Sequence, residues 1–336
     1  MKRIGKYTLE LELKPKILAS AALGGKKESE GPLGSDFDQT FSDTMLGQSS
    51  WEKAEAMMQQ EVLAMAIGKA KIRAEDIDIL FAGDLLNQCI SSIFGLRDFN
   101  IPFLGQYGAC STMAQTLLMA ALMVESGAAR TAAAVTSSHF CSAERQFRLP
   151  LEYGGQRTPT AQWTATASGC AIVTNQGEIE ISHVMPGRIV DLGIKDAANM
   201  GAAMAPAAAT SLADYFQDTN TTPEDYDGIF TGDLAMVGSR LLEKLLQEEG
   251  ISIAGKHNDC GLMIYDLEGQ DVHAGASGCG CSASVLCGHL LKEMKKPNGK
   301  YKNILFAATG ALMSPTSTQQ GESIPGICHI VHLRKI

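Results

Sequence analysis

Two stretches of the chain carry the same pattern, and this repeat restricts the possible fold more than any other feature. Residues 75–85 read EDIDILFAGDL, and residues 224–234 read EDYDGIFTGDL. In each stretch, charged residues lead into a short apolar run that stops at Gly-Asp. This is the pattern of a buried strand that ends at a loop. The two halves of the chain are therefore expected to share one fold unit.

The same order of segments continues downstream in both halves. GACST at 108–112 and CGCSA at 279–283 each precede an apolar run of helical length, and apolar strands follow these runs at 131–138 and 303–310. Helix-like segments precede the Gly-Asp strands at 50–70 and 206–218, and final strands are predicted near 170–173 and 328–333. Each half thus alternates strands with helices.

This alternation predicts a duplicated α/β fold with two mixed, mostly parallel sheets and helices on their faces. Packed together, the two units form a layered α/β/α/β/α sandwich. A chain of 336 residues is long enough for one duplicated domain. We place the two halves at residues 1–175 and 176–336. A polar insertion at 139–163 is expected to be ordered, because it contains Phe147, Tyr153 and Trp163.

Charge and composition exclude several classes of function. The formal net charge is -9, which argues against a nucleic-acid partner because no basic stripe offsets it. Neither an export signal nor an apolar stretch of roughly 18 residues is present, so the chain is expected to be intracellular and to reach a membrane only through a partner. Nine cysteines, an odd number, are interpreted as reduced thiols.

Cys110 is the strongest candidate for chemistry. It follows Gly108 and Ala109 at the start of the first buried helix, where free backbone N–H groups and the helix dipole stabilise a thiolate. The alternative interpretation is a small buried residue at a tight contact between helix and sheet.

With this cysteine in place, the duplicated layout resembles the thiolase-like superfamily. Condensing enzymes of that superfamily also use His with Asn, or two His, from the second half to stabilise an oxyanion. This chain departs there, because its corresponding loops read DLAMVGSRLLEK and GASGCGCSAS. An acyl-thioester enzyme with Cys110 as nucleophile would need His139, His257 or His273 as its base. We expect no enzymatic activity, and this enzyme is the alternative.

A closer resemblance is carried by the strings GPLGSDFD, AGDLLNQ, YGACST, LEYGGQ, DCGLMIY and ATGALMSPTS. Together they resemble the stage V sporulation protein AD family of endospore-forming bacteria. The resemblance implies binding of dipicolinic acid (pyridine-2,6-dicarboxylate) during its uptake into the developing spore. It also implies other stage V sporulation membrane proteins as partners and a peripheral location at the forespore or spore inner membrane. Thiolase-like folds usually dimerise, so a homodimer is expected, with residues 131–138 as the candidate edge strand.

The resemblance assigns Asp84, Cys110 and His139 to the dipicolinate pocket. All three follow predicted core elements, and ligands in open α/β sheets lie beyond the carboxyl ends of strands, so we expect the three residues to converge. The helix starts near Cys110 and Cys281 are related by the repeat, and we expect them to face one cleft and receive the two carboxylates.

Charged residues near this predicted pocket allow more than one interpretation. Arg145 and Arg148 are spaced for one helical face and could add positive charge, although an ordinary solvated face fits equally well. Asp84 and Asp233 are unfavourable beside a dianion unless one is protonated or holds a cation, and dipicolinate binds calcium. A capping role is more usual for such aspartates. No resident metal and no cofactor are predicted.

Overall fold

The computed structural model describes residues 1–147 and 156–336, and Arg148 therefore lies outside the described residues. Five strands of the first half lie side by side in the order β6 (Phe103–Gly105), β5 (Ile79–Gly83), β7 (Ala132–Ser138), β9 (Ala167–Thr174) and β3 (Lys16–Gly24). β9 is antiparallel to both neighbours, whereas β5 is parallel to β6 and β7. All but β9 therefore run in one direction.

The second half repeats this arrangement strand for strand. Its order is β12 (His257–Asp259), β11 (Gly228–Gly232), β14 (Asn303–Ala311), β15 (Gly326–Lys335) and β10 (Ile179–Met185), and β15 is the strand of opposite direction. The duplication predicted from the sequence is confirmed by this shared topology. Our boundary at residue 176 falls in the turn between β9 and β10 and stays a prediction.

The two sheets differ from the prediction in being joined at one end. β10 pairs with β15 on one side and with the start of β3 on the other, where Ile179 lies opposite Ile17. The hairpin of β1 (Lys2–Ile4) and β2 (Thr8–Glu10) is attached to β10, and the short β4 (Gln39–Thr40) extends beside β3. One continuous hydrogen-bonded sheet thus bends through both halves.

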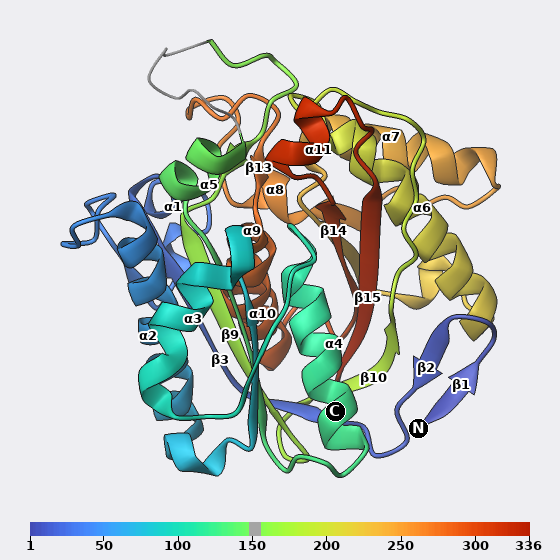
Figure 1. Cartoon of the computed structure of the whole chain (residues 1–336). Coiled ribbons are helices and arrows are strands. Elements are labelled where there is room, and N and C mark those ends of the chain that lie inside the picture. The colour runs from blue at the N-terminus through green and yellow to red at the C-terminus, as the bar shows by residue number, and fades with distance from the viewer. Residues whose placement is uncertain (148–155) are drawn as a thin grey trace.

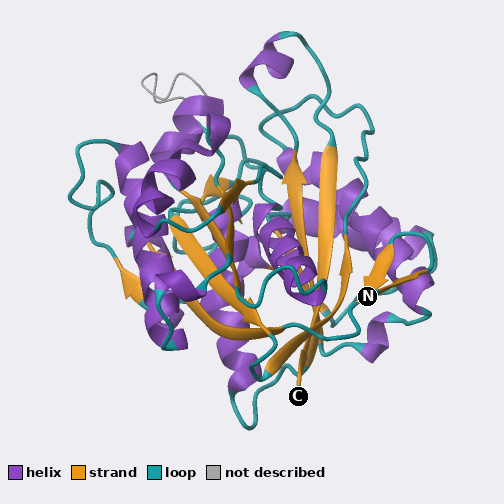
Figure 2. Ribbon diagram, turned by 60° about the horizontal axis from the view of Figure 1, so that its bottom comes forward, coloured by secondary structure: helices purple, strands orange, loops and turns teal. Residues whose placement is uncertain are grey.

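Helices form three layers around the two parts of this sheet (Figure 1). α2 (Trp51–Ala70) and α3 (Ile90–Leu96) cover the outside of the first half, and α6 (Met200–Thr219) and α7 (Ala235–Glu248) cover the outside of the second. Between the halves lie α4 (Thr112–Glu125) and α9 (Cys279–Ser284), the latter continuing through a π-helical turn at Val285–Leu290 into α10 (Leu291–Lys295). The turned view in Figure 2 shows the same alternation of helices and strands. The five-layer sandwich is confirmed.

Local sequence explains where the outer helices begin. Ser50 caps α2 by accepting a hydrogen bond from the Lys53 N–H at 3.3 Å. The helix that we predicted from Pro206 begins earlier, at Met200, because Asn199 provides the cap. Pro206 then lies within the helix rather than at its start. Within the described ranges, 1–147 and 156–336, no helix is long and apolar enough to span a bilayer.

The candidate strand for a homodimer lies in the wrong place. β7 is hydrogen-bonded to β5 on one side and to β9 on the other, so it has no free edge for a second copy. The outer strand of the first half is β6, which is paired only with β5 among the described residues. A three-residue strand of this kind carries too little periodicity to be predicted from sequence.

Candidate functional site

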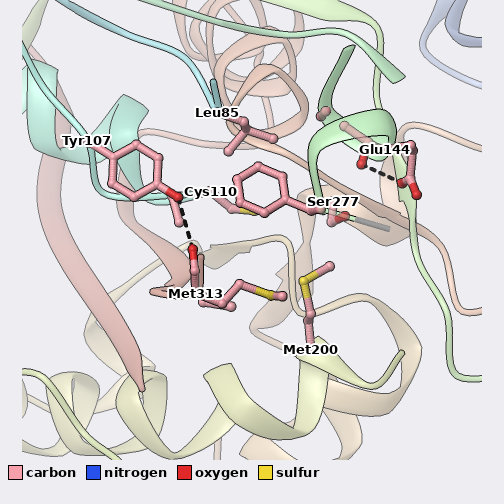
Figure 3. Close-up of a pocket in the computed structure, with 12 residues that line it drawn as sticks. Leu85, Tyr107, Cys110, Glu144, Met200, Ser277 and Met313 are labelled. Carbon is pink, nitrogen blue, oxygen red and sulfur yellow. Dashed lines mark hydrogen bonds between the residues drawn. The ribbon is translucent and has the colours of Figure 1, made fainter. Parts of the chain in front are cut away.

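A narrow cavity lies between the two halves, beyond the carboxyl ends of β5 and β14 (Figure 3). About 40 Å³ of it is open to the centre of a water-sized sphere. Its walls come from both halves of the chain and comprise Leu85, Tyr107, Ala109, Cys110, Ala143, Glu144, Phe147, Thr164, Met200, Ser277, Ala311 and Met313. Most of this lining is apolar.

Cys110 forms part of the cavity wall and lies in a strained turn before α4. Ala109 has a left-handed backbone with φ of 50°. The turn is held by the Ser111 hydroxyl, which donates to the Gly108 carbonyl at 2.6 Å, and by the Thr112 hydroxyl, which donates to the Ala109 carbonyl at 2.6 Å. Cys110 is 5% exposed. Strained backbone that the surrounding structure fixes in this way is common at functional sites.

The second half of the chain is in close contact with the turn that carries Cys110. A Cβ atom added to Gly310, at the end of β14, would lie 2.2 Å from the Gly108 carbonyl oxygen. Only glycine allows the two backbones to approach so closely. The position of Cys110 therefore depends on contact between the halves.

One end of the cavity is polar and is anchored by Trp163. The short strands β8 (Trp163–Thr164) and β13 (Ala276–Ser277) pair in parallel, which places Thr164 beside Ser277. The Trp163 ring stacks on Phe140 with ring centres 3.8 Å apart. The Thr164 hydroxyl donates to Glu144 Oε1 at 2.9 Å, and this contact is drawn in Figure 3. Glu144 belongs to α5 (Phe140–Phe147).

The opposite end carries the Tyr107 hydroxyl. Part of the Tyr107 ring is at the surface, but its hydroxyl points inward to the Met313 carbonyl at 3.5 Å (Figure 3). That hydrogen bond is long and therefore weak. Burial, followed by the nearby Cys110 sulfur, raises the pKa of Tyr107, so the hydroxyl stays a donor at neutral pH.

Asp84 is placed near this site but does not line the cavity. Its buried carboxylate accepts hydrogen bonds from the Leu86 N–H at 2.9 Å, the Ser92 N–H at 2.8 Å and the Ser92 hydroxyl at 2.6 Å. Burial raises its pKa. These hydrogen bonds connect the loop after β5 to α3. Asp84 thus has the capping role that the sequence allowed as the alternative to a place in the ligand pocket.

His139 also points away from the cavity. Its Nε2 lies 2.7 Å from the Thr44 carbonyl, and because a carbonyl can only accept, Nε2 carries the proton. Nδ1 accepts from the Cys141 N–H at 3.2 Å. Burial lowers the pKa of His139 and keeps the ring neutral. The expected convergence of Asp84, Cys110 and His139 in one cavity is therefore not found.

Cys281 and Arg145 lie at different places, and neither lines the cavity. Cys281 is buried inside α9, which begins two residues earlier at Cys279. Cys279 is the cysteine that packs with Cys110, and its thiol donates to the Ser137 carbonyl at 3.0 Å. Arg145 pairs with Glu52 and lines a neighbouring hollow of about 300 Å³. The predicted role of Arg148 lies outside the described residues.

None of the three histidines considered as a base lines the cavity, whose described lining contains no His, Lys or Arg. The His257 Nε2 is 2.8 Å from the Thr231 hydroxyl, and its Nδ1 is 3.5 Å from Glu243. The His273 Nδ1 is 2.8 Å from the Thr158 carbonyl, and its Nε2 is 3.0 Å from Asp271.

Known proteins similar to this chain identify its family. The model of the family "Stage V sporulation protein AD (SpoVAD)" matches residues 5–334. Stage V sporulation protein AD of Bacillus subtilis (strain 168) is 45% identical over 330 residues, which cover 98% of this chain and 97% of the relative. The chain belongs to the stage V sporulation protein AD family.

Solved structures show the fold of this family member to be thiolase-like. Human mitochondrial 3-ketoacyl-CoA thiolase in complex with CoA matches with a TM-score of 0.60 and 11% identity, covering 98% of this chain and 99% of the thiolase. The 3-oxoacyl-[acyl-carrier-protein] synthase III of Aquifex aeolicus VF5 matches with a TM-score of 0.57 and 14% identity, covering 95% and 99%. The resemblance predicted from sequence is confirmed for family and fold.

Proposed function

We propose that the chain binds dipicolinate in the cavity at Cys110, as a step in dipicolinate uptake into the developing spore, and that it does not catalyse condensation. The family name connects the chain with sporulation. The observation that carries the ligand proposal is the form of the cavity, which has apolar walls and a polar group at each end.

Dipicolinate fits this form because it is a flat ring with a carboxylate on either side. The Tyr107 hydroxyl at one end and the Ser277 hydroxyl at the other are suited to donate to the two carboxylates. Leu85 and Phe147 provide apolar surface for the ring. In this proposal side chains receive the two carboxylates, in place of the helix starts near Cys110 and Cys281 that we expected from the sequence.

The buried Glu144 is the one carboxylate in the described lining, and it bears on the charge of the ligand. A dianion close to a carboxylate is repelled, whereas a calcium chelate of dipicolinate is not. We therefore include the chelate as a ligand form. The other stage V sporulation membrane proteins remain the proposed partners, at the forespore or spore inner membrane.

Absence of catalysis is proposed because none of the three histidines that could serve as a base, His139, His257 and His273, lines the cavity at Cys110. A condensing enzyme needs a group to activate the thiol and donors to stabilise the oxyanion. The histidines at 139, 257 and 273 are each hydrogen-bonded elsewhere.

Substitution of Cys110 tests the site by calorimetric titration with dipicolinate. Cys110→Ser keeps the side-chain size and should retain most of the wild-type affinity, whereas Cys110→Trp fills the cavity and should abolish binding. Each titration is repeated with equimolar calcium to identify the bound form. Equal affinity of the wild type and Cys110→Trp would remove the cavity as the dipicolinate site.

Intact-protein mass spectrometry tests the enzyme alternative. The wild type and Cys110→Ser are incubated with a panel of acyl-CoA donors. An unmodified mass supports a binding protein. A stoichiometric acyl adduct that Cys110→Ser lacks, followed by turnover with malonyl-CoA, would overturn the non-catalytic proposal.

A further inference from the structure

The hollow that Arg145 lines is a second pocket, located where α2, α3 and α5 lie together on the outer side of the first half (Figure 1). Its volume of about 300 Å³ is at the lower end of the roughly 300–1,000 Å³ that is typical of small-molecule pockets. The lining differs from that of the Cys110 cavity and is mainly polar, consisting of Glu52, Leu86, Asn87, Gln88, Ile90, Ser142, Arg145 and Gln146.

The loop on one side of this pocket has a strained backbone. Gln88 and Cys89 are consecutive residues in the left-handed region, with φ of 57° and 52°. The loop is held from α5, because the Asn87 N–H donates to Gln146 Oε1 at 3.1 Å and Gln146 Nε2 donates to the Leu85 carbonyl at 3.3 Å. Strain that the surrounding structure maintains in this way is common at ligand sites.

An ion pair that is open to solvent lies in the pocket wall. The Arg145 guanidinium donates to the Glu52 carboxylate, and the two side chains are 46% and 32% exposed. The guanidinium also lies over the Trp51 ring, 5.2 Å from the ring centre, which restricts its orientation. Ion pairs this exposed contribute little to stability, so a ligand can separate the two groups at small cost.

Several hydrogen-bonding groups beside the ion pair are unused. The second carboxylate oxygen of Glu52, Nδ2 of Asn87 and the side-chain amide of Gln88 make no hydrogen bond within residues 1–147 and 156–336. Leu86 and Ile90 add an apolar patch to the same lining. The pocket thus combines a cation, an anion, amide groups and a small apolar surface.

The titratable groups behind the lining determine which ligand charge is favoured. Glu55 accepts from the Ser142 hydroxyl at 2.8 Å, and Asp84 accepts from the Leu86 N–H at 2.9 Å. Burial, followed by the charge of Asp84, raises the pKa of Glu55 to about 8, so Glu55 is protonated at neutral pH. Burial lowers the pKa of His139 and keeps it neutral. The ion pair is neutral overall, so Asp84 leaves one net negative charge, which repels a plain anion such as dipicolinate.

We propose that this pocket binds an aliphatic α-amino acid. The Arg145 guanidinium receives the carboxylate of the ligand, and Glu52 receives its ammonium group. Leu86 and Ile90 contact the aliphatic side chain. A zwitterion satisfies both charges of the ion pair and adds no net charge to a site that disfavours anions. The inference is independent of the proposed dipicolinate site.

Ligand-observed saturation-transfer NMR tests the recognition of both charged groups. The wild type is titrated with L-alanine, L-valine and L-leucine, and with two analogues of valine. Isobutylamine lacks the carboxylate, and 3-methylbutanoate lacks the ammonium group. At matched ionic strength, an amino acid should bind, isobutylamine should bind more weakly, and 3-methylbutanoate should not bind. Absence of binding for all three amino acids, or equal binding of L-valine and 3-methylbutanoate, overturns the proposal.

Charge-removing substitutions test whether the ion pair is the site. Arg145→Gln and Glu52→Gln each remove one group, and Arg188→Gln is the matched control. Arg188 is also 46% exposed, pairs with Asp214, and lies over the Tyr7 ring at 4.6 Å. Affinity for the amino acid should fall about tenfold or more in both pocket variants and stay unchanged in the control. Melting curves verify folding, and pocket variants that bind like the control contradict the assignment.

Cys110→Trp separates this pocket from the dipicolinate cavity. Because the substitution fills the cavity and leaves α2 and α3 unchanged, the variant should bind the amino acid as the wild type does. Loss of amino-acid binding in Cys110→Trp would place the ligand in the Cys110 cavity and overturn the proposal. Dipicolinate affinity should be unchanged in Arg145→Gln, so failure of one site leaves the other testable.

Discussion

At the scale of single residues, Asp84 and Asp233, the aspartates that follow the two repeated strands, have different roles. Asp84 caps its own loop, whereas in the second half the capping carboxylate is Asp259, which accepts from the Leu234 and Ala235 N–H groups at 3.0 and 2.8 Å. Asp233 is left buried with φ of 73°, and its carboxylate accepts no hydrogen bond of ordinary geometry from the described residues. Burial, then the charge of Asp259, raises its pKa.

This arrangement predicts that Asp233→Asn stabilises the protein at neutral pH. A carboxyl whose folded pKa is raised holds its proton more tightly when folded, so stability falls as pH rises from the ordinary aspartate pKa towards the raised value. Asparagine removes that dependence and tolerates the left-handed backbone. We expect the variant to melt a few degrees above the wild type at pH 7 to 8, with a smaller difference near pH 4. A lower melting temperature at pH 7 would contradict a strained, buried acid.

Sequence alone identified Cys110, because the repeat and the helix start both indicate that position. It could not place His139, whose orientation depends on the carbonyl of Thr44, far away in the sequence. Tyr107, Glu144 and Ser277 were missed for a related reason, since the cavity forms only when loops from both halves meet. The sequence indicates them only by position: Tyr107 directly precedes GACST, Glu144 lies in the 139–163 insertion, and Ser277 lies in the Gly-rich loop GASGCGCSAS.

At the scale of elements, the contact between the end of β14 and the turn before α4 links the two halves at the site. Gly310→Ala would force the new Cβ atom against the Gly108 carbonyl, and the cost of such overpacking is about 1–3 kcal/mol. We expect a lower free energy of unfolding and weaker dipicolinate binding, because the Cys110 turn must move.

Gly68→Ala is the matched control for this prediction, since nothing lies within 4 Å of the added Cβ atom in α2. It should stabilise the helix by roughly 0.5–1 kcal/mol and leave ligand affinity unchanged. Chemical denaturation and calorimetric titration of both variants provide the comparison. A Gly310→Ala protein as stable as the wild type would show that the halves are not in contact at this point.

Strand periodicity and turn residues predicted several long elements correctly, among them α2, α4, β7 and β14. The segment DLAMVGSRLLEK, which we interpreted as a loop, instead forms most of α7. The same reasoning missed β6 and β12, which have three residues each, and began α6 at Pro206 rather than Met200. Such short edge strands are defined by their pairing partner and not by their own sequence.

At the scale of the whole molecule, we propose the outer edge of β6 as the surface for the expected homodimer, because among the described residues β6 pairs only with β5. Leu104 in β6 is 50% exposed, and Phe94 in the neighbouring α3 is 52% exposed. Pairing of β6 with its copy across a two-fold axis would extend the sheet and cover these side chains.

Light scattering tests this assembly. We expect twice the 35.7 kDa mass of the chain at micromolar concentration, and a shift to monomer in Leu104→Lys, which brings like charges together at the axis. Leu13→Lys, at another exposed leucine, should remain dimeric. A wild-type mass of one chain would exclude the dimer.

The layers of the molecule were predictable from the sequence, because alternating strands and helices permit few arrangements. The join between β10 and β3 was not, since it involves only the first residues of each strand. The ligand likewise follows from family resemblance and not from the repeat, so it requires a direct measurement.

Melting temperature in the presence of two related ligands is the most direct test of a two-ended dipicolinate site. A ligand that binds only the folded state stabilises it by RT ln(1 + [L]/Kd), about 2.7 kcal/mol at a hundredfold excess over Kd. Dipicolinate should therefore raise the melting temperature of the wild type, and pyridine-2-carboxylate, which lacks one carboxylate, should raise it less at the same concentration. Equal shifts for the two compounds, or no shift with dipicolinate, would contradict the account.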